Sequence, residues 1–388
     1  MNLIPGQTVY QKLLQSLVAA LLLMPLLVHA AGNNLPSPPN IAASGYYVMD
    51  IHSGQVLASK NPSQRLEPAS LTKIMTAYIV FQELAAGNIK PQDEVLVSKK
   101  AWKMPGSRMF IEVDKRVSID ALMKGMIIQS GNDASVALAE HIAGSEESFA
   151  LMMNEQAARL GMVNTHFTNA TGLPDGDHYT TPEDILKVAA ASIKEFPEYY
   201  KLYSVKEYTF NNIRQHNRNN LLWRDKSVDG MKTGHTEAAG YCLVASAERD
   251  NMRLITVVMG TESSEARVRE TKKLLEYGYR YFETHRLYGA GQKLLSSAIW
   301  KGKQDQIELG LANDLYVTVQ RGQYSKLAAS TELPPRLIAP ISKNESLGKA
   351  VIKFNDEIIA ERPLLALHDV PEGSFIKRIT DSVMMMLE

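Results

Sequence analysis

Two segments of the chain carry apolar residues at the spacing of an α-helix. In the first, from Ser70 to about Gly87, they recur at positions i, i+3, i+4, i+7 and i+8, and they are Leu71, Ile74, Met75, Tyr78 and Ile79. Pro68 near the start and Gly87 past the end are typical helix boundaries. The second stripe follows a Ser118 cap and consists of Ile119, Leu122, Met123, Met126 and Ile127. It ends at Ser130-Gly131-Asn132, where we expect another helix to begin.

Other runs have the alternation or β-branched content of strands. They are Tyr46–Met49, Val56–Ser59, Val228–Thr236, Tyr241–Ala247 and Leu254–Met259. Asp50–Gly54 predicts a turn between the first two, and Arg249–Asn251 a tight turn that makes the last two antiparallel. Residues 145–220 are expected to be mostly helical with loops, including the turn-rich stretch Asn169–Asp177, and Arg267–Phe282 to form a closing helix. A sheet built from both chain ends with helices inserted between them is an α/β (α+β) arrangement.

The pattern changes after residue 284. Short alternating runs at Tyr316–Val319, Leu337–Ala339, Ala350–Phe354 and Leu364–Leu367 are separated by Gly, Pro, Asn and Asp. They predict a small all-β domain over residues 285–368, a β-sandwich, after a larger α/β domain over 45–284. Residues 369–388 place Phe375, Ile376, Ile379, Val383, Met386 and Leu387 on one face of a helix. This helix lies at a membrane surface or docks on the β-domain, and the sequence leaves both open.

The N-terminus has the pattern of a secretory signal. Lys12 supplies a positive charge, Leu17–Val28 is an apolar run, and Val28-His29-Ala30 is a small-residue cleavage pattern. Because Pro25 interrupts a run too short for a relaxed membrane span, we expect a signal peptide over residues 1–30 rather than an anchor. Residues 31–44 follow as a flexible leader. The sequence therefore predicts an exported protein.

Composition narrows the choice of function. The 388 residues favour two domains, and equal numbers of basic and acidic residues, 42 of each, argue against a nucleic-acid partner. The single cysteine, Cys242, excludes an intramolecular disulfide and is interpreted as a small buried apolar residue.

Three motifs carry the candidate chemistry: Ser70-Leu71-Thr72-Lys73, Ser130-Gly131-Asn132 and Lys232-Thr233-Gly234. The combination, with Asp in the middle of the second motif, is associated with β-lactamases and penicillin-binding proteins. The first motif alone is weak, since Ser346-Leu347-Gly348-Lys349 also matches it. The three motifs together, in this order and setting, are much harder to obtain by chance.

The predicted setting gives each motif a role. Ser70 at a helix start has Lys73 on the same face, and an amine partly removed from water can accept the serine proton during nucleophilic attack. At the second motif, Ser130 can relay a proton to the leaving group, and Asn132 can hold a substrate amide.

The third motif lies on a predicted strand, which can align a peptide by main-chain hydrogen bonds. Lys232 supplies charge near the proton relay, Thr233 a hydroxyl for a carboxylate, and Gly234 room for close approach of the substrate. The backbone amides of Ser70 and His235 are candidates for an oxyanion hole.

The chain resembles the low-molecular-mass penicillin-binding proteins that act as D-alanyl-D-alanine carboxypeptidases. The resemblance spans nearly the whole chain, through Pro68–Lys73, Ser130–Ala134, Asn217–Asn219, Val228–Thr236 and Arg362–Leu364. It implies a transpeptidase/β-lactamase-like catalytic domain followed by a small β-sandwich. It also implies an acyl-enzyme on Ser70, Lys73 as proton acceptor, Ser130 as second active serine and Lys232 as a substrate contact.

The resemblance also extends the predicted site and its partners. Arg267 matches an arginine that helps to hold the substrate's terminal carboxylate, and Arg218 matches a second basic residue at the site. The implied partners are peptidoglycan pentapeptides ending in D-Ala-D-Ala, with β-lactams as inhibitors, and we expect no cofactor and no metal. Peripheral attachment to the inner membrane from the periplasmic side is implied but weakened, because the C-terminal stretch is short and lacks terminal aromatic residues. Ser135 stands where related proteins often carry Cys, a change expected to have little effect on the chemistry.

Three rival functions fit the sequence less well. A β-lactamase usually needs a glutamate-activated water, and the helical insert contains Pro182-Glu183-Asp184 but no Glu-Pro-x-x-Asn pattern. A non-catalytic wall-binding protein is disfavoured because the motifs are intact. A zinc carboxypeptidase is disfavoured because none of the nine histidines falls in a His-Glu-x-x-His pattern. The balance among carboxypeptidase, endopeptidase and transpeptidase activity stays open.

Overall fold

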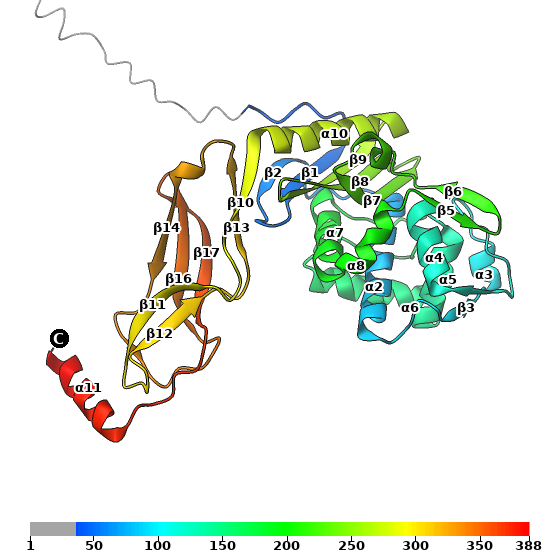
Figure 1. Ribbon diagram of the computed structural model, residues 1–388. Coiled ribbons are helices and arrows are strands. Elements are labelled where there is room, and N and C mark those ends of the chain that lie inside the picture. Colours follow the sequence, from blue (N-terminus) through cyan, green and yellow to red (C-terminus); the bar gives the residue numbers. More distant parts are fainter. Residues whose placement is uncertain (1–35, 388) are drawn as a thin grey trace, which may run out of the picture. The chain divides into compact units, whose positions relative to one another are not determined.

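A computed structural model describes residues 36–387 (Figure 1). The predicted signal peptide, the first residues of the leader and Glu388 lie outside the described residues. The catalytic part is built on a five-stranded antiparallel sheet of order β2-β1-β9-β8-β7. Its strands are β1 (Gly45–Asp50), β2 (Val56–Lys60), β7 (Val228–Thr236), β8 (Gly240–Arg249) and β9 (Met252–Thr261). The predicted sheet from both chain ends is therefore confirmed.

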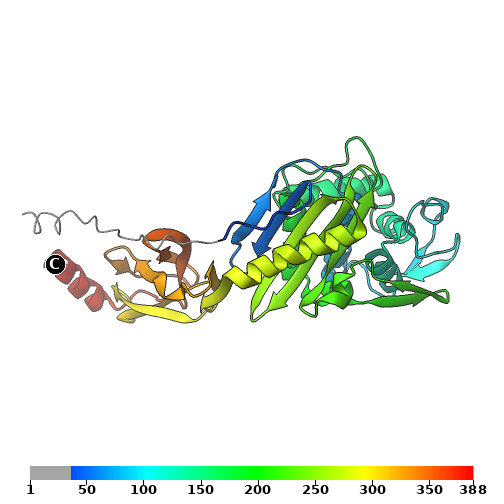
Figure 2. The same ribbon diagram turned by 90° about the horizontal axis from the view of Figure 1, so that it is seen from above.

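The predicted turn between β8 and β9 is also present. Asp250 and Asn251 have φ angles of 48° and 64°, which are the left-handed conformations that a two-residue hairpin turn requires. The closing helix α10 (Ser264–Tyr281) lies across one face of the sheet and contacts β8 and β9 (Figure 2). Helix α7 (Pro182–Glu195) contacts β9 and β1.

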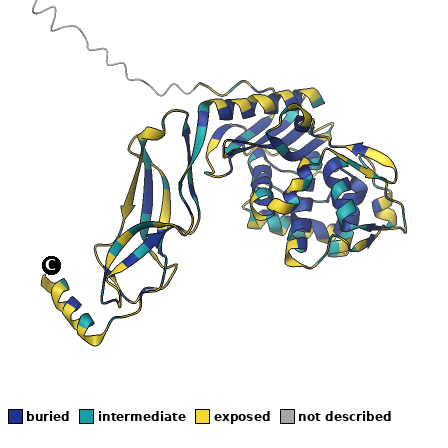
Figure 3. Ribbon diagram, viewed as in Figure 1, coloured by how far each residue is buried: buried dark blue, intermediate teal, exposed yellow. Residues whose placement is uncertain are grey.

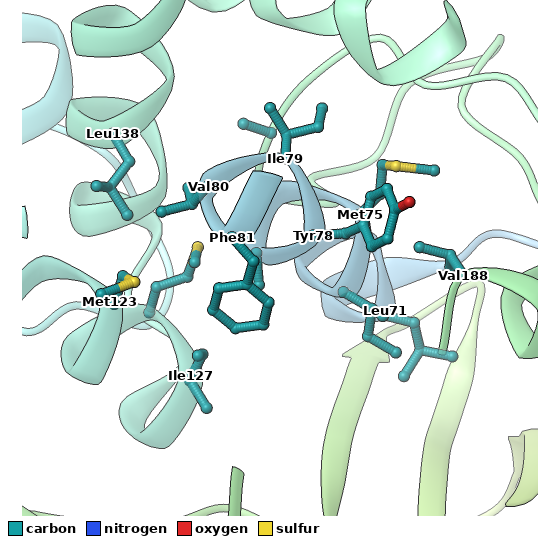
Figure 4. Close-up of a cluster of buried hydrophobic side chains, with 14 of the residues drawn as sticks. Leu71, Met75, Tyr78, Ile79, Val80, Phe81, Met123, Ile127, Leu138 and Val188 are labelled. Carbon is teal, nitrogen blue, oxygen red and sulfur yellow. The ribbon is translucent and has the colours of Figure 1, made fainter. Parts of the chain in front are cut away.

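The first predicted helix begins as a 3-10 turn, η1 (Ala69–Thr72), and continues as α2 (Lys73–Ala86). Gly87 ends it with a φ of 76°. A single apolar stripe was expected, but every residue from Leu71 to Phe81 is buried (Figure 3). The side chains of α2 pack against those of neighbouring helices, including Met123, Ile127 and Leu138 (Figure 4). A helix that is apolar on most sides forms the centre of a core rather than its surface.

The second stripe also forms a helix, α4 (Ile119–Lys124), capped by Ser118, whose Oγ accepts a hydrogen bond from the Ala121 N–H. A π-helical turn, η2 (Gly125–Gln129), follows. The chain then turns at Ser130, which has a φ of 67°, and enters α5 (Asn132–Ala143). The predicted helix–junction–helix arrangement is thus confirmed, and its junction presents the second motif.

The expectation that residues 145–220 are mostly helical is wrong at their C-terminal end. Helices α6 (Glu146–Arg159), α7 and α8 (Pro197–Tyr200) and the 3-10 turn η3 (Lys201–Ser204) are followed by a hairpin of β5 (Glu207–Phe210) and β6 (Ile213–His216). Asn211 and Asn212 have φ angles of 47° and 60° at its turn. Asparagine tolerates this conformation, so the pair was the signal for a hairpin. Shorter elements of the catalytic part are β3 (Glu94–Leu96), α3 (Lys99–Trp102), β4 (Arg116–Ser118) and α9 (Leu221–Arg224).

The C-terminal part is a β-sheet domain, as predicted. A two-stranded sheet pairs β10 with β13, and a six-stranded sheet has the order β14-β16-β17-β12-β11-β15. The strands are β10 (Phe282–Tyr288), β11 (Lys293–Trp300), β12 (Gln306–Gly310), β13 (Leu315–Gln320), β14 (Leu327–Glu332), β15 (Leu337–Ile338), β16 (Ser346–Phe354) and β17 (Glu357–Ala366), with a 3-10 turn η4 (Tyr324–Lys326). The sequence pattern had indicated β13, β15, β16 and β17. Strands β10, β11, β12 and β14 were not indicated, and in β14 nearly every residue is exposed and the residues do not alternate in polarity.

The last element is helix α11 (Phe375–Leu387), where an amphipathic helix was predicted. Its Asp381 side chain is buried and accepts a hydrogen bond from the Lys301 N–H at 2.6 Å. Lys377 pairs with Asp305 at 2.5 Å. The opposite apolar side chains are exposed, among them Phe375, Ile376, Val383, Met386 and Leu387. Within residues 36–387, no helix has the length and apolar content needed to cross a bilayer.

Candidate active site

The nucleophile candidate Ser70 lies on a strained turn. Ala69, directly before it, has a φ of 46°, a conformation that non-glycine residues rarely adopt and that is often found at functional sites. The 3-10 turn leaves Ser70 partly exposed, while Lys73, three residues later, is only 1 % exposed. The predicted same-face arrangement of these two side chains is present, with the lysine more deeply buried than expected.

Lys73 is the centre of the hydrogen-bond network. Its Nζ lies 3.1 Å from Ser70 Oγ, 2.7 Å from Asn132 Oδ1 and 2.6 Å from the carbonyl oxygen of Thr171. Burial lowers the pKa of Lys73 from 10.5 to about 7, although the carboxylates of Asp133 and Glu146 act in the opposite direction. A large fraction of the amine is therefore neutral near pH 7.

The three contacts determine where the lone pair of that amine points. A neutral amine has two N–H groups and one lone pair, and a carbonyl oxygen can only accept a hydrogen bond. The two N–H groups therefore donate to Asn132 Oδ1 and Thr171 O. This leaves the lone pair for Ser70, whose hydroxyl can donate its proton to it. The geometry is that of a serine with its general base.

A second serine–lysine pair joins the second and third motifs. Lys232 Nζ donates to Ser130 Oγ at 2.9 Å and to the Thr233 carbonyl at 3.1 Å. Lys232 is 2 % exposed, and burial, followed by the charges of Lys73, Arg267 and Arg218, holds its pKa well below the ordinary value. With the Lys73–Asn132 contact, this pair brings all three predicted motifs into one site.

Asn132 is held within the protein at both ends of its side-chain amide. Its Nδ2 donates to the Pro105 carbonyl at 2.7 Å, while its Oδ1 accepts from Lys73. Its backbone N–H donates to the Ser107 carbonyl at 2.7 Å. A Cβ on Gly106 would lie 2.9 Å from Nδ2, so the loop approaches the amide closely at this glycine. The structure thus shows Asn132 orienting Lys73, a role that sequence reasoning did not assign.

Asp133 holds the same loop and was also missed as a site residue. Its buried carboxylate accepts hydrogen bonds from the N–H groups of Met109, Phe110 and Ile111 at 3.0, 2.9 and 3.3 Å. These bonds fix the loop whose carbonyls hold Asn132. The acidic residue after the Ser-Gly-Asn motif was visible in the sequence, but its partners are more than twenty residues away.

Strand β7 lies at the open end of the sheet order and next to the Ser70 turn. A Cβ on Gly234 would lie 3.1 Å from the Pro68 carbonyl and 3.2 Å from Ala69 Cβ. Gly234 therefore permits a close approach of the strand to the nucleophile turn, and close approach of substrate at this glycine stays a prediction. Thr233 is buried, and His235 is exposed and stacks on Tyr241 with ring centroids 3.9 Å apart.

The two arginines have different surroundings. Arg267 is buried, donates to the Gly234 carbonyl at 3.3 Å and to Ser264 Oγ at 3.2 Å, and lies over the Tyr241 ring. It braces the strand that carries the third motif. Arg218 is exposed, and its charge contributes to the lowered pKa of Lys232, so it is the more accessible cation at the site.

The second copy of the first motif is not part of this site. Ser346 and Lys349 lie on strand β16, and Lys349 pairs with Glu361 at 2.8 Å and Glu332 at 3.3 Å. Among residues 36–387, no cluster of three or more His, Cys, Asp or Glu side chains has the arrangement of a metal site. Cys242 is buried, as predicted.

A partly exposed serine paired with a buried lysine at the start of a helix is joined, through an asparagine and a second serine–lysine pair, to a sheet edge. This arrangement defines the class of serine acyl-transfer enzymes that includes penicillin-binding proteins. A family model described as D-alanyl-D-alanine carboxypeptidase matches residues 33–263, and one described as penicillin-binding protein 5, C-terminal domain, matches residues 282–372. The chain belongs to the D-alanyl-D-alanine carboxypeptidase family.

Individual relatives agree with this assignment. The D-alanyl-D-alanine carboxypeptidase DacC of Escherichia coli is 42% identical over 388 residues, which cover 97% of this chain and 97% of that protein. DacA of the same organism is 41% identical over 91% of this chain and 89% of its own length. Penicillin-binding protein 5 of Haemophilus influenzae has a TM-score of 0.83 and 42% identity, covering 87% of this chain and 100% of that one.

A more distant relative has been solved with a β-lactam. Penicillin-binding protein D2 of Listeria monocytogenes, in its ampicillin-bound form, has a TM-score of 0.58 and 29% identity. The match covers 62% of this chain and 100% of that one.

Proposed function

We propose that this protein is a serine-type D-Ala-D-Ala carboxypeptidase that removes the terminal D-alanine from peptidoglycan pentapeptides through an acyl-enzyme on Ser70. The observation that carries the proposal is the contact of Ser70 Oγ with the buried Nζ of Lys73. Asn132 Oδ1 and the Thr171 carbonyl accept the two N–H groups of the neutral amine, so its lone pair faces the serine. The names of its relatives supply the substrate class.

The reaction has two halves. In the first, Ser70 Oγ attacks the carbonyl carbon of the penultimate D-alanine and its proton passes to Lys73. The C–N bond then breaks, and the proton held by Lys73 passes to the leaving nitrogen through the hydroxyl of Ser130, which accepts a hydrogen bond from Lys232, so that Lys73 is again neutral. In the second, Lys73 takes a proton from water as the water attacks the ester, and the Ser70 oxygen regains a proton when the shortened peptide leaves.

Substrate recognition follows from the edge position of strand β7. An extended peptide added beside this strand pairs with its main chain. The backbone amides of Ser70 and His235 are proposed to stabilise the oxyanion. Arg218, with the Thr233 hydroxyl and the charge of Lys232, binds the terminal carboxylate, and Arg267 supports these groups by bracing Gly234. Asn132 contacts the substrate amide while it orients Lys73.

Penicillins acylate the same serine, in line with the ampicillin-bound form of the Listeria relative. The surroundings of Lys73 favour slow hydrolysis of the penicillin-acylated serine over the rapid hydrolysis of a β-lactamase. In the part of the chain that the structure describes, the hydrogen-bond partners of Lys73 are a serine, an amide and a backbone carbonyl, with no carboxylate among them. A carboxylate that activates water is the feature a β-lactamase of this fold usually needs.

For location, we propose export by residues 1–30 and peripheral attachment of the protein to the periplasmic side of the inner membrane. The exposed apolar side chains of α11, opposite the buried Asp381, support attachment, and one such helix gives reversible binding. We propose domain limits of 45–284 for the catalytic domain and 285–368 for the β-domain, with the β-domain acting as a spacer that holds the site away from the membrane. Deletion of the β-domain should then impair wall trimming in cells.

The test is release of D-alanine from a pentapeptide ending in D-Ala-D-Ala. The wild-type chain should release D-alanine and take a covalent label from a fluorescent penicillin, and Ser70→Ala should do neither. Ser346→Ala is the matched control, because it alters the same motif outside the site and should leave both readouts unchanged. D-alanine release by Ser70→Ala at the wild-type rate would refute the proposal.

A further inference from the structure

The loop of residues 168–178, which we call the clasp loop, supplies the Thr171 carbonyl that Lys73 contacts. It lies directly against the start of the nucleophile helix. A Cβ on Gly172 would lie 1.7 Å from the Ala69 carbonyl oxygen, and Gly172 has a φ of +82°, so only glycine permits this approach. The Ala170 carbonyl also accepts a hydrogen bond from Thr76 Oγ1 at 2.8 Å.

His178 connects the far end of this loop to the residue beside Lys73. Its Nδ1 accepts a hydrogen bond from the Thr168 N–H at 3.0 Å, so in the neutral ring the proton is on Nε2. That N–H then donates to Thr72 Oγ1 at 2.8 Å. His178 is 3 % exposed, and burial lowers its pKa to about 4, so the ring is neutral over the working range. The reaction proposed above makes no use of this ring.

Within the clasp loop, His178 Nδ1 contacts the N–H and hydroxyl of Thr168 and lies 3.4 Å from Asn169 Nδ2, while the backbone around Thr171 is held by a separate set of hydrogen bonds. Asn169 Oδ1 accepts hydrogen bonds from the N–H and the hydroxyl of Thr171 and from the Gly172 N–H. These bonds hold the loop backbone in shape around the Thr171 carbonyl. The bond from His178 Nε2 then links the loop to Thr72, which directly precedes Lys73 in the chain.

We propose that His178 is a positioning residue that, through Thr72, holds the Thr171 carbonyl against the Lys73 amine and so directs the amine lone pair at Ser70. The proposal rests on the role of Lys73 as general base proposed above. Without the link, the carbonyl moves away, one N–H of the amine loses its fixed acceptor, and the lone pair no longer has a single direction. A displacement of this kind lowers the rate of proton transfer without removing any reacting group.

The loss also has a signature in the pH profile. A carbonyl acceptor stabilises an ammonium group more than a neutral amine, so loss of the Thr171 contact lowers the pKa of Lys73. The other charges facing Lys73 are Asp133, Glu146 and Lys232. Those facing His178 are Asp175, His166 and Lys73 itself. None of these groups changes in the His178 and Thr72 variants below, and only His166 changes in the control.

The experiment measures the second-order rate of acylation by a fluorescent penicillin from about pH 5 to about pH 10, with the full chain. His178→Phe keeps the ring volume without either hydrogen bond, and Thr72→Val removes only the acceptor. We expect each variant to lower the plateau rate by about tenfold or more and to move the acid limb to lower pH. The acylation rate of the double variant should be little lower than that of either single variant, because the two substitutions break the same hydrogen bond. His178→Gln, which can still donate to Thr72, should recover part of the rate.

His166→Phe is the matched control, since His166 lies at the same loop but is exposed and bonds to the Asp177 carbonyl. It should leave both plateau and acid limb unchanged. Full labelling at saturation establishes that each variant is folded. If either of the two variants, His178→Phe or Thr72→Val, labels fully with the wild-type rate and pH profile, the inference is wrong. If Lys73→Ala labels at the wild-type rate, the proposed function itself fails, and the two failures are thereby distinguished.

Discussion

Replacing Lys73 by methionine should abolish acylation and, at neutral pH, stabilise the protein. Folding moves this amine out of water and lowers its pKa from 10.5 to about 7. Between these two values the unfolded chain carries a proton on Lys73 that the folded chain does not. The free energy of unfolding of the wild type therefore rises with pH across this window, and below about pH 7 the full cost of burying the amine is present.

The size of the effect follows from the shift. This fall in the pKa of Lys73 lowers the free energy of unfolding of the wild type by about 5 kcal/mol at pH 7. Methionine has a similar length and no charge, but it leaves Asn132 Oδ1 and the Thr171 carbonyl without their donor, at about 1–2 kcal/mol each. The variant should then be more stable than the wild type by about 1–3 kcal/mol at pH 7. This advantage should disappear as the pH approaches 10.

The measurement is thermal or urea unfolding of both proteins at about pH 7 and about pH 9.5. Lys103→Met, at an exposed position, is the control, and its difference from the wild type should not change with pH. A Lys73→Met variant that is less stable than the wild type by the same amount at both pH values would refute the reasoning. It would mean that the buried amine is not destabilising.

Three further substitutions test other contacts. Gly172→Ala forces a Cβ onto the Ala69 carbonyl and should destabilise the protein by about 3 kcal/mol or more, seen as a lower melting temperature; an unchanged melting temperature would contradict the close approach. Asp133→Asn places an amide N–H₂ against the backbone N–H groups of Met109 and Phe110. It should slow acylation, measured by penicillin labelling, about tenfold to a hundredfold. A wild-type rate would mean that this loop needs no carboxylate. Asp381→Ala removes the acceptor of the Lys301 N–H and should speed hydrogen exchange at Lys301 while acylation stays unchanged; unaltered exchange would show that α11 docks by other contacts.

Local patterns were enough to predict the framework of the catalytic domain. Helix α2, the sheet strands and the tight turn at Asp250 depend on periodicity and turn chemistry within a few residues, which a sequence displays directly. The same holds for the pairing of Ser70 with Lys73, because residues three apart share a helix face.

The features that were missed depend on contacts between distant segments. Nothing near Thr171 or His178 in the sequence shows that they lie against residues about one hundred positions earlier. The loop could be predicted as turn-rich, but its partner could not. The burial of Lys73 was underestimated for the same reason, since one stripe predicts one buried face and the remaining faces of α2 are covered by helices far along the chain.

The two buried lysines have a consequence for ligand binding. Lys73 and Lys232 are both buried with lowered pKa values, and the charge of Lys73 contributes to the lowered pKa of Lys232. An arriving carboxylate brings negative charge to this environment and makes the protonated amines less costly. Binding of an anionic peptide end should therefore draw protons from solution, so that the heat of binding depends on the ionisation enthalpy of the buffer.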